Sequence, residues 1–105
     1  MNGKVTISPE VVVQVARITT LATPGVLGLI DPTGKSGAGD HSRGIVASLE
    51  DNSAHIHLNV IAAPDAPLLV LASHIQANVA NAIAEIVGIE TTIIDVTFED
   101  VMVKA

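Results

Sequence analysis

The longest uninterrupted helical pattern in the chain runs from Asp65 to Gly88, and it constrains the fold more than any other feature. Pro67 suits the first turn of a helix, where its missing N–H needs no partner. Gly88 suits the left-handed residue just past a helix end. The apolar side chains between them recur at helical spacing and share one face. That face consists of Leu68, Leu71, Ala72, Ile75, Val79, Ala82, Ile83 and Ile86. A helix with such a wide apolar face needs a sheet to lie on.

Small side chains form a second strip along the same helix. Its members are Ser73, Ala77, Ala80 and Ala84. Because the distance between packed helices depends on the side chains at the contact, this strip lets another helix approach closely. The other helix can belong to the same chain or to a second copy, and we therefore predict the strip as an interaction surface.

A shorter helix is predicted to begin at Pro9 and to end near Ala22. Ser8 supplies a hydroxyl cap, Pro9 fits the first position, and Glu10 lies near the positive end of the helix dipole. Its buried stripe is predicted to comprise Val11, Val15, Ile18 and Ala22. Val13 is expected to be more exposed.

Alternating apolar and polar residues predict the strands. We expect them at Lys4–Ile7, Val26–Ile30, Gly44–Glu50, Ala54–Ala62 and Glu90–Val103. The resulting order, β-α-β-β-β-α-β, predicts an α+β fold: a two-layer α/β sandwich whose two helices cover one face of a mixed sheet. The opposite face carries polar residues and is expected to be solvated or used for assembly.

Composition restricts the classes of function. The 105 residues predict one domain spanning 1–105, and 49% hydrophobic against 15% charged residues excludes disorder. A net charge of −6 and a single aromatic residue argue against nucleic-acid binding, and that charge also opposes an anionic membrane. The absence of cysteine excludes thiolate metal sites. No apolar run reaches about 18 residues, so direct membrane insertion is not expected. With no signal-peptide core after Met1, we expect a cytoplasmic protein.

The segment from Asp31 to Arg43 is rich in glycine and is predicted to be a flexible loop. Gly34-Lys35-Ser36 within it resembles part of a phosphate-binding loop. Five residues separate Gly28 from Gly34 where that motif needs four, and Gly37-Ala38-Gly39 follows where a helix must begin. We therefore expect no nucleotide, and no cofactor of any kind.

His55 and His57 share one side of a predicted strand, roughly 7 Å apart along it. Two imidazoles at this spacing can share a metal ion if a third ligand arrives. Asp95 or Glu99 of the last strand, or Asp40 or His41 of the loop, are candidates. The simpler alternatives are that these residues form a solvated polar face or that their charge responds to pH. No nucleophile elbow or paired-carboxylate spacing links the Ser, His and Asp residues, so we predict no catalytic residues and no enzyme.

Three motifs in this order resemble the alkaline shock protein family, also called the envelope stress response family of Gram-positive and related bacteria. They are Gly3-Lys4-Val5-Thr6-Ile7-Ser8-Pro9-Glu10-Val11, then Pro24-Gly25-Val26-Leu27-Gly28, and then the long helix ending at Gly88 followed by Val96, Phe98 and Asp100-Val101. The Gly-rich loop and the strand of His55 and His57 depart from the family's pattern. The resemblance implies a small α/β protein of cell-envelope homeostasis without catalytic residues, sometimes self-assembling and held near the membrane by a separate anchor protein.

These observations lead to three hypotheses. The first is a non-enzymatic stress-response or scaffold protein that self-associates as a homo-oligomer and binds a small membrane-anchored protein. Its apolar surface candidates are Val13, Ile61, Leu69 and Val70. The alternative is a small-molecule or metal-binding module that uses the loop and the histidine pair. Nucleic-acid binding comes last because of the charge.

Overall fold

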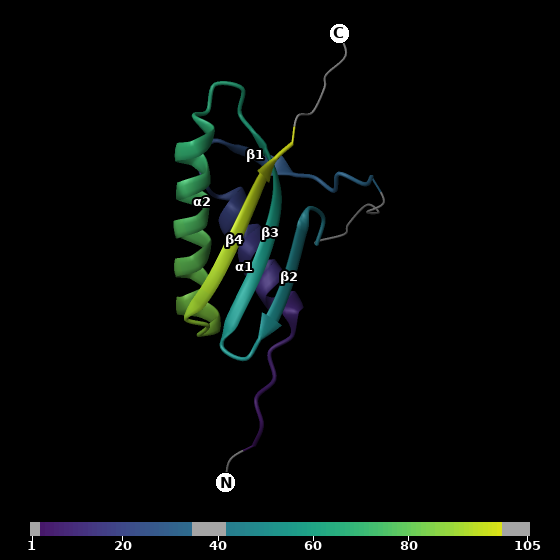
Figure 1. Cartoon of the computed structure of the whole chain (residues 1–105), viewed down its shortest axis with the longest axis vertical. Coiled ribbons are helices and arrows are strands. Elements are labelled where there is room, and N and C mark those ends of the chain that lie inside the picture. Colours follow the sequence, from purple (N-terminus) through teal and green to yellow (C-terminus); the bar gives the residue numbers. More distant parts are fainter. Residues whose placement is uncertain (1–2, 35–41, 100–105) are drawn as a thin grey trace.

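The computed structural model describes residues 3–34 and 42–99. Its elements in chain order are α1 (Pro9–Leu21), β1 (Val26–Leu29), β2 (Ile45–Glu50), β3 (Ser53–Ala62), α2 (Leu68–Ala82), the π-helical turn η1 (Ile83–Val87) and β4 (Thr91–Phe98). One layer is the sheet and the other is the pair of helices behind it (Figure 1). The α+β class and the two-layer arrangement are confirmed.

The start of α1 and the end of the helical segment that follows Pro67 lie where the sequence provides the required residue types. The Ser8 hydroxyl accepts a hydrogen bond from the Glu10 N–H at 3.2 Å, and Pro9 follows at the first helical position. After α2, the turn η1 continues to Gly88, whose φ of 87° is left-handed as predicted. Pro67 is the cap residue of α2 and makes no side-chain cap hydrogen bond.

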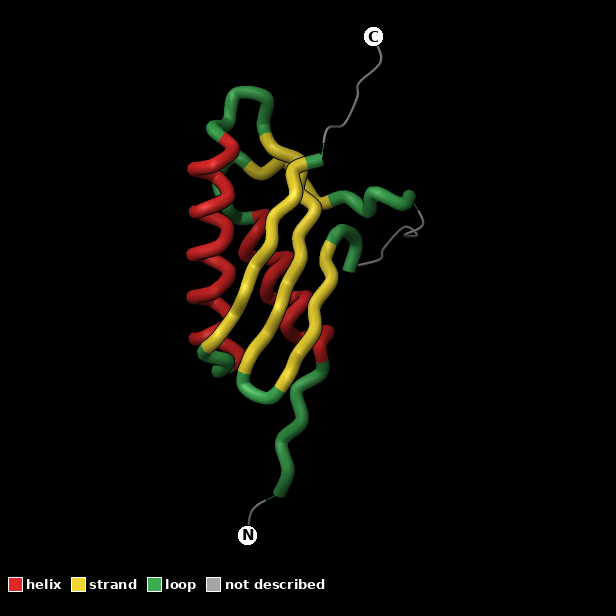
Figure 2. Tube along the Cα trace, in the orientation of Figure 1, coloured by secondary structure: helices red, strands yellow, loops and turns green. Residues whose placement is uncertain are grey.

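The strand β3 is the centre of the sheet. β4 pairs with one of its edges in parallel, while β2 and β1 pair antiparallel with successive parts of its other edge (Figure 2). The sheet is therefore mixed, as predicted. β2 and β3 form a hairpin around Asp51, whose φ of 52° is left-handed.

The core lies between one face of this sheet and the two helices. Ile56, Leu58 and Val60 of β3 are fully buried, and so are Ile75, Val79 and Ile83 on the α2 side. Figure 2 shows α1 and α2 side by side behind the same face of the sheet. The prediction of two helices on one face is confirmed, although Leu68 and Ile86 at the ends of the predicted α2 face are exposed.

The strand predicted at residues 4–7 is not present. These residues pair with none of the described strands, and Val5 is 86% exposed. A strand needs a partner for its backbone hydrogen bonds. Both edges of β3 are already occupied, so the segment finds no place beside the central strand.

The stripe of α1 that is buried differs from the predicted one. Val12, Val13, Ala16 and Thr20 are buried, whereas Val11 and Ile18 are 45% and 63% exposed. Residues 11–16 contain five apolar side chains, so two neighbouring stripes have similar hydrophobicity. The small Ala16 lets α1 lie close to α2 and the sheet, and close packing decides which stripe turns inward.

Two predictions fall partly outside the described residues. Most of the Gly-rich loop predicted as flexible, namely 35–41, lies there, and so does the end of the last strand from Asp100 onward. The flexible loop at 31–43 therefore stays a prediction, as does the single domain spanning 1–105.

Candidate interaction surfaces

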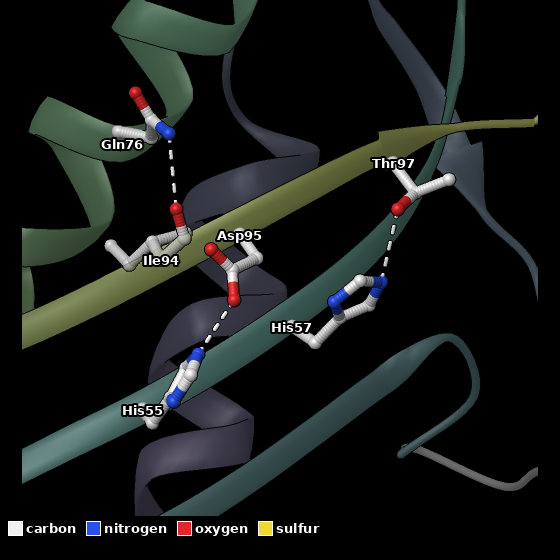
Figure 3. A network of polar contacts seen from close by, with 6 residues as sticks. All are labelled: His55, His57, Gln76, Ile94, Asp95 and Thr97. Carbon is white, nitrogen blue, oxygen red and sulfur yellow. Dashed lines mark hydrogen bonds and ion pairs between the residues drawn. The ribbon is translucent and has the colours of Figure 1, made fainter.

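The face of the sheet that points away from the helices carries a short row of polar contacts. His55 Nε2 lies 2.6 Å from Asp95 Oδ2, and Thr97 Oγ1 lies 3.1 Å from His57 Nε2 (Figure 3). Both contacts join β3 to β4, which the parallel register brings side by side. The alternation of β3 that buries Ile56 and Leu58 on one side therefore places both histidines on the other.

Solvent reaches this row. The side chains of His55 and Asp95 are 55% and 54% exposed. Even with a protonated histidine, a pair in such a position contributes about 0–1 kcal/mol, because water and salt screen the charges. The row therefore adds little to folding, and its side chains are accessible to a partner.

Apolar side chains flank the histidines on both neighbouring strands. Val46 of β2 is 67% exposed and Ile93 of β4 is 55% exposed. Val46 is the register partner of His57, and Ile93 is the register partner of His55. We call this set, Val46, His55, His57, Ile93, Asp95 and Thr97, the open sheet face. Apolar groups set among polar ones are typical of protein interfaces.

The predicted metal site has one of its expected contacts but no third ligand among the described residues. Asp95 reaches His55 as anticipated, but His57 is turned toward Thr97. Within 3–34 and 42–99, no three His, Asp or Glu side chains are grouped closely enough to hold an ion. Asp40 and His41, the loop candidates, lie outside the described residues.

The small-residue strip of α2 lies on the outer surface of that helix. Ser73, Ala77 and Ala84 are exposed, and Ala80 is half-buried. Ala80 packs against the core, whereas the other three members of the strip are left exposed by the fold. Its role in binding another molecule stays a prediction.

A shallow groove of about 380 Å³ lies where the turn after α1 meets the start of α2. Pro24, Gly25, Pro67, Val70 and Leu71 provide much of its lining. Next to it, Leu69 is 87% exposed and Val70 51% exposed, whereas Ile61 is half-buried and Val13 is buried. Two of the four predicted apolar surface residues are therefore at the surface.

Sequence reasoning missed Val46 and the groove. The alternation of Ile45, Ala47 and Leu49 with Val46, Ser48 and Glu50 could have placed Val46 on the open sheet face. The groove had no such signal, because it depends on how the turn at Pro24 packs against α2.

On the membrane question, the part of the chain that is described contains no helix with the length and hydrophobicity needed to cross a bilayer.

Comparison with known proteins gives one family and one group of similar folds. The model of the alkaline shock protein 23 family, described as having a cell envelope-related function, matches residues 1–103. No curated protein is similar at a significant level.

Similar solved structures include several forms of MamM CTD. A double variant of it is 16% identical, with 87% of this chain and 83% of that chain covered and a TM-score of 0.58. The zinc form of another variant is 16% identical, covering 88% and 87%, with a TM-score of 0.56. The copper form is 15% identical, covering 90% and 79%, with a TM-score of 0.57. At these identities the likeness shows the fold alone.

Proposed function

The chain belongs to the alkaline shock protein 23 family, whose function is cell envelope-related, and on this premise we propose that it is a non-enzymatic scaffold that self-associates and binds a membrane-anchored partner. The observation that carries the proposal is the division of the sheet. One face is filled by the two helices, and the open sheet face is left to solvent with Val46 and Ile93 exposed.

Self-association through the open sheet face is supported by its composition. Val46 and Ile93 are 67% and 55% exposed, so removing the exposed part of each side chain from water is worth about 1–2 kcal/mol. Between them, the imidazoles and the Asp95 carboxylate can exchange hydrogen bonds with a second copy. We propose a homo-oligomer in the cytoplasm, where the partner recruits it to the membrane.

Light scattering after size exclusion at micromolar concentration tests this step. The wild-type chain is expected to exceed its monomer mass of 10.8 kDa. The Val46→Lys/Ile93→Lys variant is expected to associate at least about tenfold more weakly, since each 1.4 kcal/mol is tenfold. Leu69→Lys is the control, because it charges an apolar site on α2 that is 87% exposed and lies away from the open sheet face. A strictly monomeric wild type, or equal losses in both variants, would contradict the proposal.

For the membrane-anchored partner we propose the small-residue strip of α2. Ser73, Ala77 and Ala84 are exposed, so a partner helix can approach the α2 backbone closely there. Ala77→Glu is expected to release the protein from the membrane fraction of its native cells while leaving its oligomeric mass unchanged. Retention of Ala77→Glu at the membrane would exclude the strip.

A metal-binding module is the second candidate, favoured by the 2.6 Å contact between His55 and Asp95. A rotation of His57 toward Asp95, its register partner, would bring a third ligand. Zinc titration of the wild type and of His57→Ala tests this. Tighter binding by the wild type is expected for such a site, and identical affinities would remove it.

A further inference from the structure

The segment that precedes α1 has the sequence of a strand and no strand to pair with among the described residues. Polar and apolar residues alternate along Lys4, Val5, Thr6 and Ile7, and the segment belongs to no helix or strand of the structure. Val5 is 86% and Ile7 36% exposed. Figure 1 shows this segment leaving the body beyond the end of the sheet. Its apolar residues and its backbone groups are therefore available to another molecule.

The sheet has a matching free edge on β2. The Gly44 carbonyl accepts a hydrogen bond from the Asn59 N–H at 2.8 Å, so alternate residues from Gly44 onward pair with β3. The backbone groups of Ala47 and Leu49 consequently point outward, and no described strand pairs with them. On the opposite margin, Gln76 Nε2 donates to the Ile94 carbonyl at 3.0 Å, which occupies part of that edge.

We propose that residues 3–8 of one copy add to β2 of a second copy as an extra antiparallel strand. The proposal rests on the self-association proposed above and names one contact that produces it. An exposed edge is a template for such addition, and main-chain hydrogen bonds supply its affinity. The added segment and the six residues of β2 are of similar length.

One register satisfies both the apolar and the charged residues. When Ile7 lies beside Ala47 and Val5 beside Leu49, the two apolar side chains cover the half-buried edge residues of β2 on the helix side. The same register places Thr6 beside Ser48 and Lys4 beside Glu50, so that opposite charges meet on the outer side. Residues directly opposite in an antiparallel pair interact most strongly.

The chain cannot make this pairing with its own β2. In Figure 1, β2 runs toward the end of the molecule at which α1 begins. A segment that folded back to join α1 at Ser8 would run in the same direction as β2. The pairing would then be parallel, and Lys4 would lie away from Glu50. A second copy allows the antiparallel register.

Proline variants test the backbone contact. In the proposed register the Val5 N–H bonds to β2 and the Thr6 N–H points away. Val5→Pro is expected to weaken self-association about tenfold, whereas the matched control Thr6→Pro changes it less than about threefold, because proline is tolerated where the N–H is unpaired. The fold of the monomer is expected to survive both changes, since Val5 lies outside the core.

Disulfide formation tests the position, since the natural chain has no cysteine. Mixed Thr6→Cys and Ser48→Cys chains are expected to form a heterodisulfide, because residues opposite in a non-hydrogen-bonded pair lie within disulfide reach. Mixed Thr6→Cys and Glu85→Cys chains, with the second cysteine on η1, are not expected to form one. The strand addition is wrong if Val5→Pro associates as strongly as the wild type and no disulfide forms between the mixed Thr6→Cys and Ser48→Cys chains. Self-association of the wild type would still support the proposed function in that case. If the wild type is a monomer throughout, both are wrong.

Discussion

The two faces of the central strand β3 differ more than any two regions of the molecule. Ile56 and Leu58 are completely buried beneath the helices, while the side chain of His55, one residue along, is 55% exposed. The buried face of β3 consists of aliphatic side chains that pack against the helices. The open sheet face has hydrogen bonds between side chains that water can replace. Folding free energy is therefore concentrated on one face, and the other can change its contacts without unfolding the chain.

Substitution of neighbouring residues on β3 is expected to give the largest contrast between the faces. Ile56→Ala leaves a cavity in the core and is expected to lower the free energy of unfolding by about 2–5 kcal/mol. His57→Ala removes a surface contact and is expected to change it by less than about 0.5 kcal/mol. Urea unfolding measures both. Losses of equal size would show that the open sheet face also supports the fold.

A smaller loss is expected where α2 meets the margin of β4. The Gln76 side chain donates to the Ile94 carbonyl at 3.0 Å in a partly buried position. Gln76→Ala is expected to cost about 1 kcal/mol, the usual net value of such a hydrogen bond. Thermal unfolding would detect the change, and Gln76→Glu, which keeps the length but loses the donor, should show a similar loss. An unchanged melting temperature in both variants would mean that α2 needs no polar contact with the sheet.

Thr20 is an exception to the apolar character of the covered face. It is fully buried, and its hydroxyl has no hydrogen-bond partner among the described residues. Thr20→Val keeps the shape and removes the desolvated hydroxyl, so a gain of up to about 1 kcal/mol is expected. Thr20→Ser, which keeps the hydroxyl and loses a methyl group, should instead be destabilising. A loss of stability in Thr20→Val would indicate a polar partner for this hydroxyl.

The smallest effect is expected at the ion pair of the open sheet face. His55 and Asp95 are more than half exposed. Asp95→Asn is expected to change the free energy of unfolding by less than about 0.5 kcal/mol, and the change should shrink further in 0.5 M salt. A loss above about 2 kcal/mol in chemical denaturation would place this pair in the folding core and remove the contrast between the faces.

The sequence predicted the parts of the fold in which local signals agree. Ser8, Pro9 and Gly88 mark helix ends, and the alternation of β3 assigns each of its residues to a face. The orientation of α1 could not be predicted, because Val11–Val13 and Val15–Ala16 give two stripes of similar hydrophobicity. The strand at 4–7 was predicted from alternating polar and apolar residues, a pattern typical of strands. A strand also needs a neighbouring strand with free backbone groups. That partner is set by tertiary pairing, which local alternation does not contain.

The candidate surfaces were predicted to a smaller extent. The outward positions of His55, His57 and Asp95 could be predicted from the alternation of side chains along a strand. The contact between His55 and Asp95 could not, because it depends on the parallel register of β3 and β4. The exposure of Val46 and the groove beside Val70 depend on which side each strand and turn presents after packing.

The reactivity of the histidines toward diethyl pyrocarbonate, measured by mass spectrometry below and above the concentration of self-association, tests the division of the two faces most directly. His55 and His57 report on the open sheet face, and His74, exposed on α2, is the internal control. We expect the first two to lose reactivity as the protein associates while His74 keeps it. Protection of His74 with unchanged reactivity at His55 and His57 would contradict the account.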